Sequence, residues 1–244
     1  MLAIIGGTGL SALADVEVTH REVVRTPYGE PSAPLTFGTI RGVPVVFLAR
    51  HGYGHTIAPH EVNYRANLWA LRETSASEVI SVASVGGIRA AFGPGEIVVP
   101  DQLIDYTWGR KNTYFEGGAP VTHVDFTKPY SGKLRMRILA AAAACAESVF
   151  EEGVYAATQG PRLDSAAEIN RLERDGADLV GMTGMPEAAL AREIDLQYAA
   201  IAVVVNYAAG RAESRQGVKM ENVDEVLRRT MSRVRRIIEA LVTS

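Results

Sequence analysis

The chain has 244 residues, of which 47% are hydrophobic and 22% charged, which excludes a disordered chain, a collagen-like repeat and a coiled-coil rod. The formal net charge of −3 offers no basic field that would attract nucleic acid or an anionic membrane. The single cysteine, Cys145, cannot form an intramolecular disulfide, and residues 1–10 lack the pattern of a signal peptide. We therefore expect a cytoplasmic protein without nucleic-acid or membrane partners.

Short apolar runs rich in β-branched residues recur along the chain and predict strands buried on both faces. In chain order they are residues 2–5, 43–48, 79–85, 96–99, 154–157, 179–180 and 200–205. Helix-like stretches occupy residues 59–74, 133–150, 165–176, 185–197 and 222–242. No linker, charge block or repeat divides the sequence, so we expect one α/β domain over residues 1–244. Residues 104–130 fit neither pattern, and we interpret them as a long functional loop or a partner contact.

The first apolar run leads into a glycine-rich turn, Gly6-Gly7-Thr8-Gly9. Glycines allow backbone amides to approach an anion closely, and the threonine hydroxyl adds a donor, so the turn could hold phosphate. A tight turn without a ligand would use the same glycines. Gly7, Gly9 and Ala12 also match a dinucleotide-binding fingerprint, but residues 16–24 look extended where that fold needs a helix.

The second apolar run ends in Arg50-His51. A permanently charged guanidinium fork and a second donor suit a small tetrahedral oxyanion, although Arg50 could instead form a structural ion pair. The three histidines of residues 51–60 are of a type that binds metals, but their spacing is not helical and no cysteine or acidic cluster joins them. We therefore expect no metal site.

Two further strand ends carry polar side chains. Met182 and Thr183 follow a short apolar run, where they could supply an apolar surface and a hydroxyl, although a methionine there is more often part of a core. Asn206 closes the last run, and a buried amide must be hydrogen-bonded, cap a helix or face a ligand.

Taken together, these residues resemble the trimeric purine nucleoside phosphorylase superfamily, most closely its methylthioadenosine and methylthioinosine phosphorylase branch. The resemblance covers nearly the whole chain. Its strongest segments are IIGGTGL at 4–10, RHGYGHTIAPHEVNYRANLWAL at 50–71, GPRLDSAAE at 160–168, GADLVGMTGMPEAALARE at 176–193 and IAVVVNYAAG at 201–210. The resemblance implies a single-domain fold with a central mixed sheet flanked by helices, and a homotrimer.

The resemblance also implies roles for individual residues. Phosphate would be bound by Thr8, Arg50, His51, Ala83, Ser84 and Thr183. The nucleoside would be bound by Met182, Asn206, Tyr207, Ala208, Asp164, Leu163, Val218, Val223, Val226 and His123, the last reaching a neighbouring subunit. Arg50, His51 and Asn206 would be the catalytic set. Orthophosphate would be a co-substrate, and neither a metal nor an organic cofactor is implied.

The chain departs from the methylthioadenosine enzymes at the residues expected to meet the base. Those enzymes carry aspartates where this chain has Asn206 and Ala208, and commonly a serine where it has Asp164. An asparagine amide donates, which suits the O6 and N7 acceptors of a 6-oxopurine. A carboxylate at 164 could accept the N1 proton that hypoxanthine has and adenine lacks. These differences predict a 6-oxopurine substrate.

Val218, Val223 and Val226 are placed by the resemblance around the 5′ substituent, which favours a methylthio group, although valines on a helix face are also ordinary core residues. We therefore expect phosphorolysis of S-methyl-5′-thioinosine to hypoxanthine and 5-methylthioribose 1-phosphate in purine salvage. A methylthioadenosine phosphorylase and a general 6-oxopurine nucleoside phosphorylase are the nearest alternatives. An NAD-dependent oxidoreductase and a non-catalytic nucleoside-binding module are more remote ones.

Overall fold

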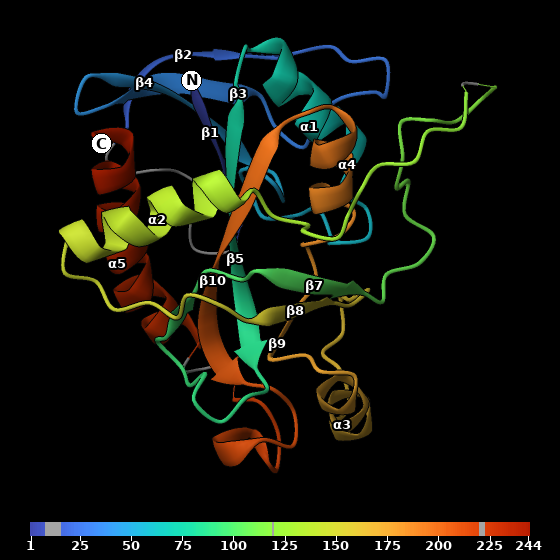
Figure 1. Cartoon of the computed structure of the whole chain (residues 1–244), viewed down its shortest axis with the longest axis vertical. Coiled ribbons are helices and arrows are strands. Elements are labelled where there is room, and N and C mark those ends of the chain that lie inside the picture. The colour runs from blue at the N-terminus through green and yellow to red at the C-terminus, as the bar shows by residue number, and fades with distance from the viewer. Residues whose placement is uncertain (8–15, 119, 220–222) are drawn as a thin grey trace.

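The computed structural model describes residues 1–7, 16–118, 120–219 and 223–244 (Figure 1). Within them, ten strands form one mixed sheet in the order β2-β3-β4-β1-β5-β9-β8-β7, with β10 paired to β5 and β6. The strands are β1 (Leu2–Gly6), β2 (Glu17–Glu22), β3 (Leu35–Ile40), β4 (Val43–Ala49), β5 (Glu78–Gly87), β6 (Ile97–Val98), β7 (Gln102–Asp105), β8 (Val154–Ala157), β9 (Leu179–Gly181) and β10 (Gln197–Tyr207).

Five α-helices and one short 3₁₀ helix accompany the sheet in the described residues. They are α1 (Tyr64–Glu73), α2 (Gly132–Ala144), α3 (Ala166–Arg174), α4 (Glu187–Glu193), α5 (Val223–Val242) and the 3₁₀ turn Ala212–Ser214. Helix α5 packs against α2 and β10, whereas α1 packs against α4, so helices flank the sheet on different sides (Figure 1). The predicted α/β fold with a mixed sheet flanked by helices is confirmed.

The centre of the sheet is buried because helices and outer strands cover it. Strand β5 runs parallel to β1 and β10, and its last two residues pair antiparallel with β9. Every side chain of β1 is buried, as is nearly all of β5 and β10. The continuous apolar runs that predicted these strands therefore reflect burial on both faces.

Three predicted helices are shorter than expected. The helix predicted over 59–74 begins at Tyr64, because Asn63 caps it by accepting a hydrogen bond from the Ala66 amide. The one predicted over 133–150 ends at Ala144, and Ala146 has a φ of 56°, outside the helical region. The one predicted over 185–197 ends at Glu193, before β10 begins.

Strands β3 and β7 were not predicted, and β2 was expected only as part of an extended stretch over residues 16–24. All six residues of β2 are exposed, so no apolar pattern marks it. Strand β7 lies at the start of the unassigned segment, which then runs from 106 to 131 with no helix or strand among its described residues. In the described part of the chain, no helix is both long and apolar enough to cross a bilayer.

Candidate active site

A cavity of about 520 Å³ opens where β1, β4, β8 and β9 end and along the last residues of β5 and β10. Ligands in sheets of this kind bind beside strand ends, so the cavity lies where the sequence predicted a site. Most of the predicted site residues line it together: Arg50, His51, Ala83, Ser84, Leu163, Asp164, Met182, Thr183, Asn206, Ala208, Val218 and Val223.

Four predicted site residues are not among the described lining. Thr8 lies outside the described residues. The Tyr207 hydroxyl points to the Ala90 carbonyl, 3.3 Å away, although the Tyr207 backbone carbonyl accepts a bond from Asn206. Val226 is half-buried on α5, and His123 is exposed in the segment after β7. Within one subunit, the structure therefore does not bring the side chains of Tyr207, Val226 and His123 to the cavity.

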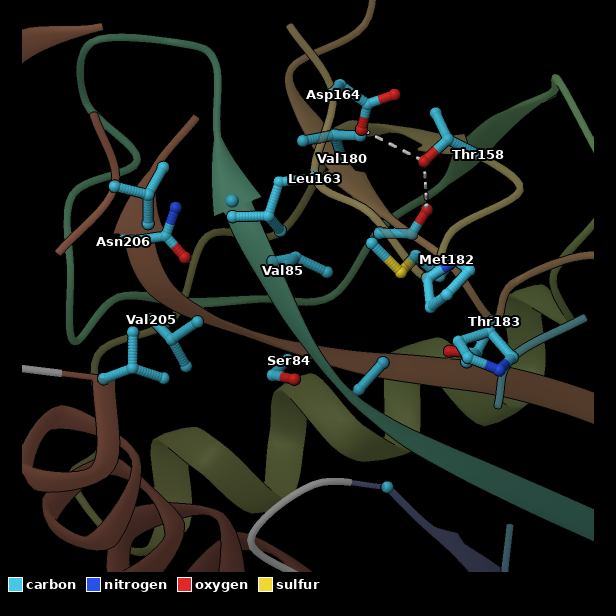
Figure 2. Close-up of a pocket in the computed structure, with 18 of the residues that line it drawn as sticks. Ser84, Val85, Thr158, Leu163, Asp164, Val180, Met182, Thr183, Val205 and Asn206 are labelled. Atoms are coloured by element: carbon cyan, nitrogen blue, oxygen red, sulfur yellow. Dashed lines mark hydrogen bonds between the residues drawn. The ribbon is translucent and has the colours of Figure 1, made fainter. Parts of the chain in front are cut away.

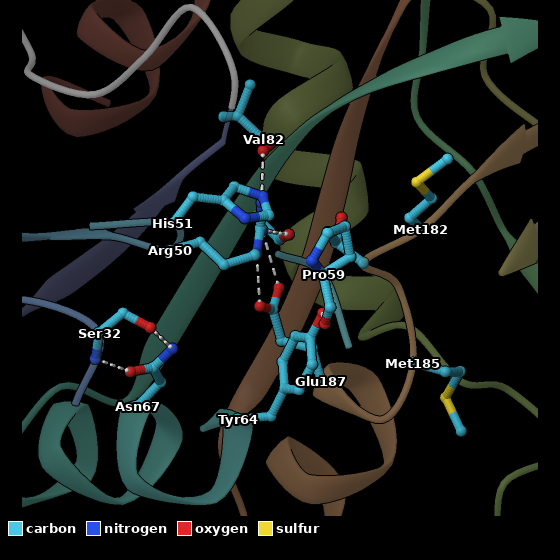
Figure 3. Close-up of polar contacts among 12 residues, drawn as sticks. Ser32, Arg50, His51, Pro59, Tyr64, Asn67, Val82, Met182, Met185 and Glu187 are labelled. Carbon is cyan, nitrogen blue, oxygen red and sulfur yellow. Dashed lines mark hydrogen bonds and ion pairs between the residues drawn. The ribbon is translucent and has the colours of Figure 1, made fainter. Parts of the chain in front are cut away.

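Arg50 is fully buried and paired with Glu187, whose side chain is also fully buried at the start of α4 (Figure 3). The Nε atom lies 2.8 Å from one carboxylate oxygen and Nη2 lies 3.0 Å from the other. Burial disfavours the charged guanidinium, but the Glu187 carboxylate outweighs it and raises the pKa of Arg50 above its usual value. The fork that we predicted to face phosphate is thus turned to Glu187, which is the structural ion pair left open by the sequence.

Among the described residues, one Nη1 hydrogen of Arg50 is left for a ligand. The other donors serve Glu187, the Ser81 hydroxyl at 2.6 Å and the Val82 carbonyl at 3.2 Å. A Cβ atom at Gly7 would lie 2.9 Å from Nη1, so glycine is needed there to keep space beside this donor. Arg50 can therefore offer an anion one N–H rather than a bidentate fork.

His51 is an acceptor toward the cavity rather than the donor we predicted. Burial and the neighbouring Arg50 charge lower its pKa to about 4, so the ring is neutral at pH 7. Its Nδ1 lies 2.8 Å from the Ile57 carbonyl, which can only accept, so Nδ1 carries the proton. The Nε2 atom is left with a lone pair that can accept a hydrogen from a hydroxyl or a protonated phosphate.

The depressed pKa of His51 predicts a loss of stability in acid. The unfolded state binds a proton near pH 6.5 and the folded state near pH 4, so stability falls as the pH drops through that window. We expect His51→Asn, whose amide can still donate to Ile57, to remove about 2 kcal/mol of this pH dependence, after allowance for partial exposure. Urea unfolding at pH 4.5 and 7 measures it, and equal pH slopes in both proteins would contradict the depressed pKa of His51.

Asn206 and Asp164 bring polar groups to another part of the cavity (Figure 2). The Asn206 amide nitrogen donates to the Tyr207 carbonyl at 2.6 Å, which fixes its orientation and leaves its second hydrogen free to donate. The Thr158 hydroxyl donates to Asp164 at 3.1 Å. Burial raises the pKa of Asp164 above its ordinary value. The two side chains offer a donor and an acceptor.

Comparison with known proteins identifies the family of the chain. The family model of the phosphorylase superfamily matches residues 1–243. The chain belongs to the phosphorylase superfamily. Among relatives, it is 49% identical to a probable S-methyl-5′-thioinosine phosphorylase from Pseudomonas syringae pv. tomato, with 99% of this chain and 98% of the relative covered. It is 43% identical to the 6-oxopurine nucleoside phosphorylase of Pyrococcus furiosus, over 86% of this chain and 80% of that one.

The fold of this superfamily member is also found in solved structures. Methylthioadenosine phosphorylase from Schistosoma mansoni in complex with adenine superimposes with a TM-score of 0.94 at 33% sequence identity. The match covers 99% of this chain and 90% of that chain. The whole described fold, including the strand ends around the cavity, is therefore shared with a phosphorylase.

Two residues that shape the site were not among the sequence candidates. Glu187 is one of them, and its signal in the sequence is a lone carboxylate in an otherwise apolar stretch. Thr158 follows β8 and bonds to Asp164, but no motif marks it. No group of three or more His, Cys, Asp or Glu side chains within the described ranges is arranged to hold a metal ion.

Proposed function

We propose that the protein catalyses phosphorolysis of S-methyl-5′-thioinosine to hypoxanthine and 5-methylthioribose 1-phosphate. The observation that carries this proposal is that Asn206 and Asp164 line the same cavity, because a donor and an acceptor together would suit the edge of a 6-oxopurine. The names of the relatives from Pseudomonas syringae and Pyrococcus furiosus support it. A purine-salvage role follows from the reaction.

Phosphate binds, in this proposal, at the part of the cavity lined by Arg50, His51, Ser84 and Thr183. Arg50 offers its remaining Nη1 hydrogen, and His51 accepts a hydrogen bond from a P–OH group through Nε2. The two roles are complementary, because a monoprotonated or diprotonated phosphate has both acceptor oxygens and a hydroxyl. The glycine turn with Thr8 is proposed to add donors.

The reaction needs no covalent enzyme intermediate. A phosphate oxygen forms a bond to C1′ as the C1′–N9 bond breaks through an oxocarbenium-like state, and the bonding electrons leave on the purine. The proton carried by the attacking phosphate ends on the released hypoxanthine. Asn206 donates to the N7 and O6 edge as negative charge builds there, while Asp164 accepts from N1–H. Positioning and these electrostatic contacts supply the catalysis, without a metal or an organic cofactor.

An apolar wall of the cavity is proposed to hold the 5′ group. Val205, Val218 and Val223 line the same cavity. A methylthio group gains from burial against these side chains, whereas a 5′-hydroxyl would lose hydrogen bonds to water there. We therefore propose the methylthio nucleoside rather than inosine as the preferred substrate. We also propose a cytoplasmic homotrimer in which His123 reaches the site of a neighbouring subunit.

A panel of substrates tests the proposal directly. Purified protein is incubated with methylthioinosine, methylthioadenosine, inosine and adenosine, with and without phosphate, and free base is followed. We expect phosphate-dependent hypoxanthine release, fastest from methylthioinosine. Preference for methylthioadenosine would indicate a methylthioadenosine phosphorylase, and preference for inosine a general 6-oxopurine nucleoside phosphorylase. Base release without phosphate would indicate a hydrolase. Absence of any base release would overturn the proposed function.

Replacing Asn206 by aspartate is expected to move the preference toward 6-aminopurines. A carboxyl group that can both accept and donate fits N6 and N7 of adenine, whereas it loses the amide donor for O6. The ratio of kcat/KM for methylthioinosine to that for methylthioadenosine should fall by about 10-fold to 100-fold, the range of one or two hydrogen bonds. Asn170→Asp is the matched control. Asn170 is exposed on α3, and its side-chain oxygen accepts a hydrogen bond from Arg211. An unchanged ratio would remove Asn206 from base recognition.

A further inference from the structure

Arg110 lies in the segment between β7 and α2 that the sequence left unassigned, and it reaches the backbone of two other loops. Its Nη1 donates to the carbonyls of Met182 at 2.8 Å and Met185 at 2.6 Å. Its Nη2 donates to the carbonyls of Gln159 at 2.8 Å and Thr158 at 3.3 Å. One guanidinium therefore ties the loop after β8 to the loop after β9.

A third contact links Arg110 to the loop that follows His51. Its Nη1 lies 3.2 Å from the Tyr64 hydroxyl, and the guanidinium stacks 5.5 Å from the centre of that ring. The same hydroxyl donates to the Pro59 carbonyl at 2.8 Å, and Pro59 lines the cavity (Figure 3). Arg110 is therefore connected to three walls of the cavity: the 158–164 segment, the 182–185 segment and the 51–59 loop.

The tied segments carry the groups that the proposed reaction uses. The Thr158 carbonyl accepts a hydrogen bond from Arg110, and the Thr158 hydroxyl donates one to Asp164. The Met182 carbonyl accepts a hydrogen bond from Arg110, and Met182 directly precedes Thr183, which lines the cavity. Beyond the backbone bond from the Thr158 amide to the Gly181 carbonyl, Arg110 is thus a side-chain link between the segment that carries the proposed base-binding carboxylate and the segment that carries the proposed phosphate-binding hydroxyl.

The contacts require an arginine. A guanidinium has five N–H donors fixed in a plane, so it can bond several carbonyls in different directions, whereas a lysine has one ammonium that must choose among them. Within the described residues, no carboxylate lies within ion-pair distance of Arg110, so its partners are carbonyl, hydroxyl and amide oxygens. Its guanidinium therefore hydrogen-bonds mainly to backbone carbonyls and does not form a surface ion pair in the described part of the chain.

We propose that Arg110 is a positioning residue, which sets the geometry between the base and phosphate parts of the cavity by clamping the Thr158–Gln159 and Met182–Met185 carbonyls. This inference rests on the proposed function for its kinetic consequences. A displacement of about 1 Å between reacting groups can lower a rate about 100-fold. Loss of the clamp should therefore act on kcat even though Arg110 is not a lining residue of the cavity.

The test compares Arg110→Lys with Arg135→Lys. Arg135 is a matched control because it is half-buried and also bonds to backbone carbonyls, those of Pro100, Val99 and Glu151, away from the cavity. We expect Arg110→Lys to lower kcat for phosphate-dependent base release at least 30-fold, of the order expected for misplaced reacting groups, while Arg135→Lys stays within about threefold. Thermal unfolding of both variants separates this effect from loss of fold. A kcat for Arg110→Lys within threefold of the unmodified protein, or an equal fall in both variants, would overturn the proposal.

A second readout does not depend on activity. Methyl-labelled methionine NMR reports the surroundings of Met182 and Met185, whose signals are assigned by Met→Leu replacement. We expect both signals to shift or broaden in Arg110→Lys and to stay in place in Arg135→Lys. Unchanged signals would overturn the clamp even if the chain proved to have another activity, whereas an inactive wild-type protein with shifted signals would overturn the proposed function alone.

Discussion

Glu187→Gln is expected to lower the free energy of unfolding by about 3 to 5 kcal/mol, because it leaves the charge of Arg50 buried without its partner. Both side chains are fully buried, and the carboxylate also accepts a hydrogen bond from the Tyr198 hydroxyl at 2.8 Å. Since each kcal/mol shifts the melting temperature by about 2 to 4 °C in a chain of this size, we expect a fall of about 10 °C. Calorimetry or a circular-dichroism melt in phosphate-free buffer measures it.

Two further variants make this prediction specific. Glu173→Gln removes the partner of Arg211 on the surface, where the carboxylate is 56% exposed, and should cost less than about 1 kcal/mol. The double change Arg50→Met with Glu187→Met removes both charges and should recover much of the stability lost in Glu187→Gln. A Glu187→Gln protein no less stable than Glu173→Gln would show that the ion pair does not stabilise the fold.

The buried ion pair also explains why sequence reasoning described Arg50 incompletely. A strand end with Arg50-His51 was recognisable from the local pattern, and the structure places both residues at the cavity. The partner that turns the guanidinium away is Glu187, 137 positions along the chain. A local sequence pattern cannot predict a contact between residues so far apart in the chain. The orientation of the guanidinium and its remaining Nη1 donor are therefore known only from the structure.

The same distinction holds for the secondary structure. Strands β1, β5 and β10 were predictable because burial on both faces demands an unbroken apolar run. Strand β2 was recognisable only as an extended stretch, because all its residues are exposed and its pairing with β3 leaves no apolar pattern in the sequence. Strand β7 has four residues, half-buried or exposed, whose pairing with β8 no sequence pattern marks.

Some residues of the candidate site could be predicted from local sequence patterns and others could not. Residues that directly follow apolar runs, such as Met182 and Asn206, could be selected because strand ends bear ligands in sheets of this type. Arg110 could not, since it lies in a segment without periodicity and acts on carbonyls that every residue possesses. The tautomer of His51 likewise depends on the Ile57 carbonyl rather than on any side-chain motif.

Asp164→Asn is expected to lower kcat/KM for the 6-oxo nucleoside by about 100-fold to 1000-fold, because a site built to pair a polar group discriminates strongly when that pair is lost. The carboxylate accepts from Thr158 and can accept N1–H of hypoxanthine, whereas an asparagine that accepts from Thr158 turns its NH₂ toward that proton. Adenine offers an unprotonated N1, so kcat/KM for the 6-amino nucleoside should fall little or rise.

The measurement is kcat/KM for methylthioinosine and methylthioadenosine. Asp175→Asn, whose carboxylate accepts from the Tyr106 hydroxyl outside the cavity, is the control. Equal losses on both nucleosides would assign Asp164 to the structure of the loop, because base selection requires the two substrates to respond differently.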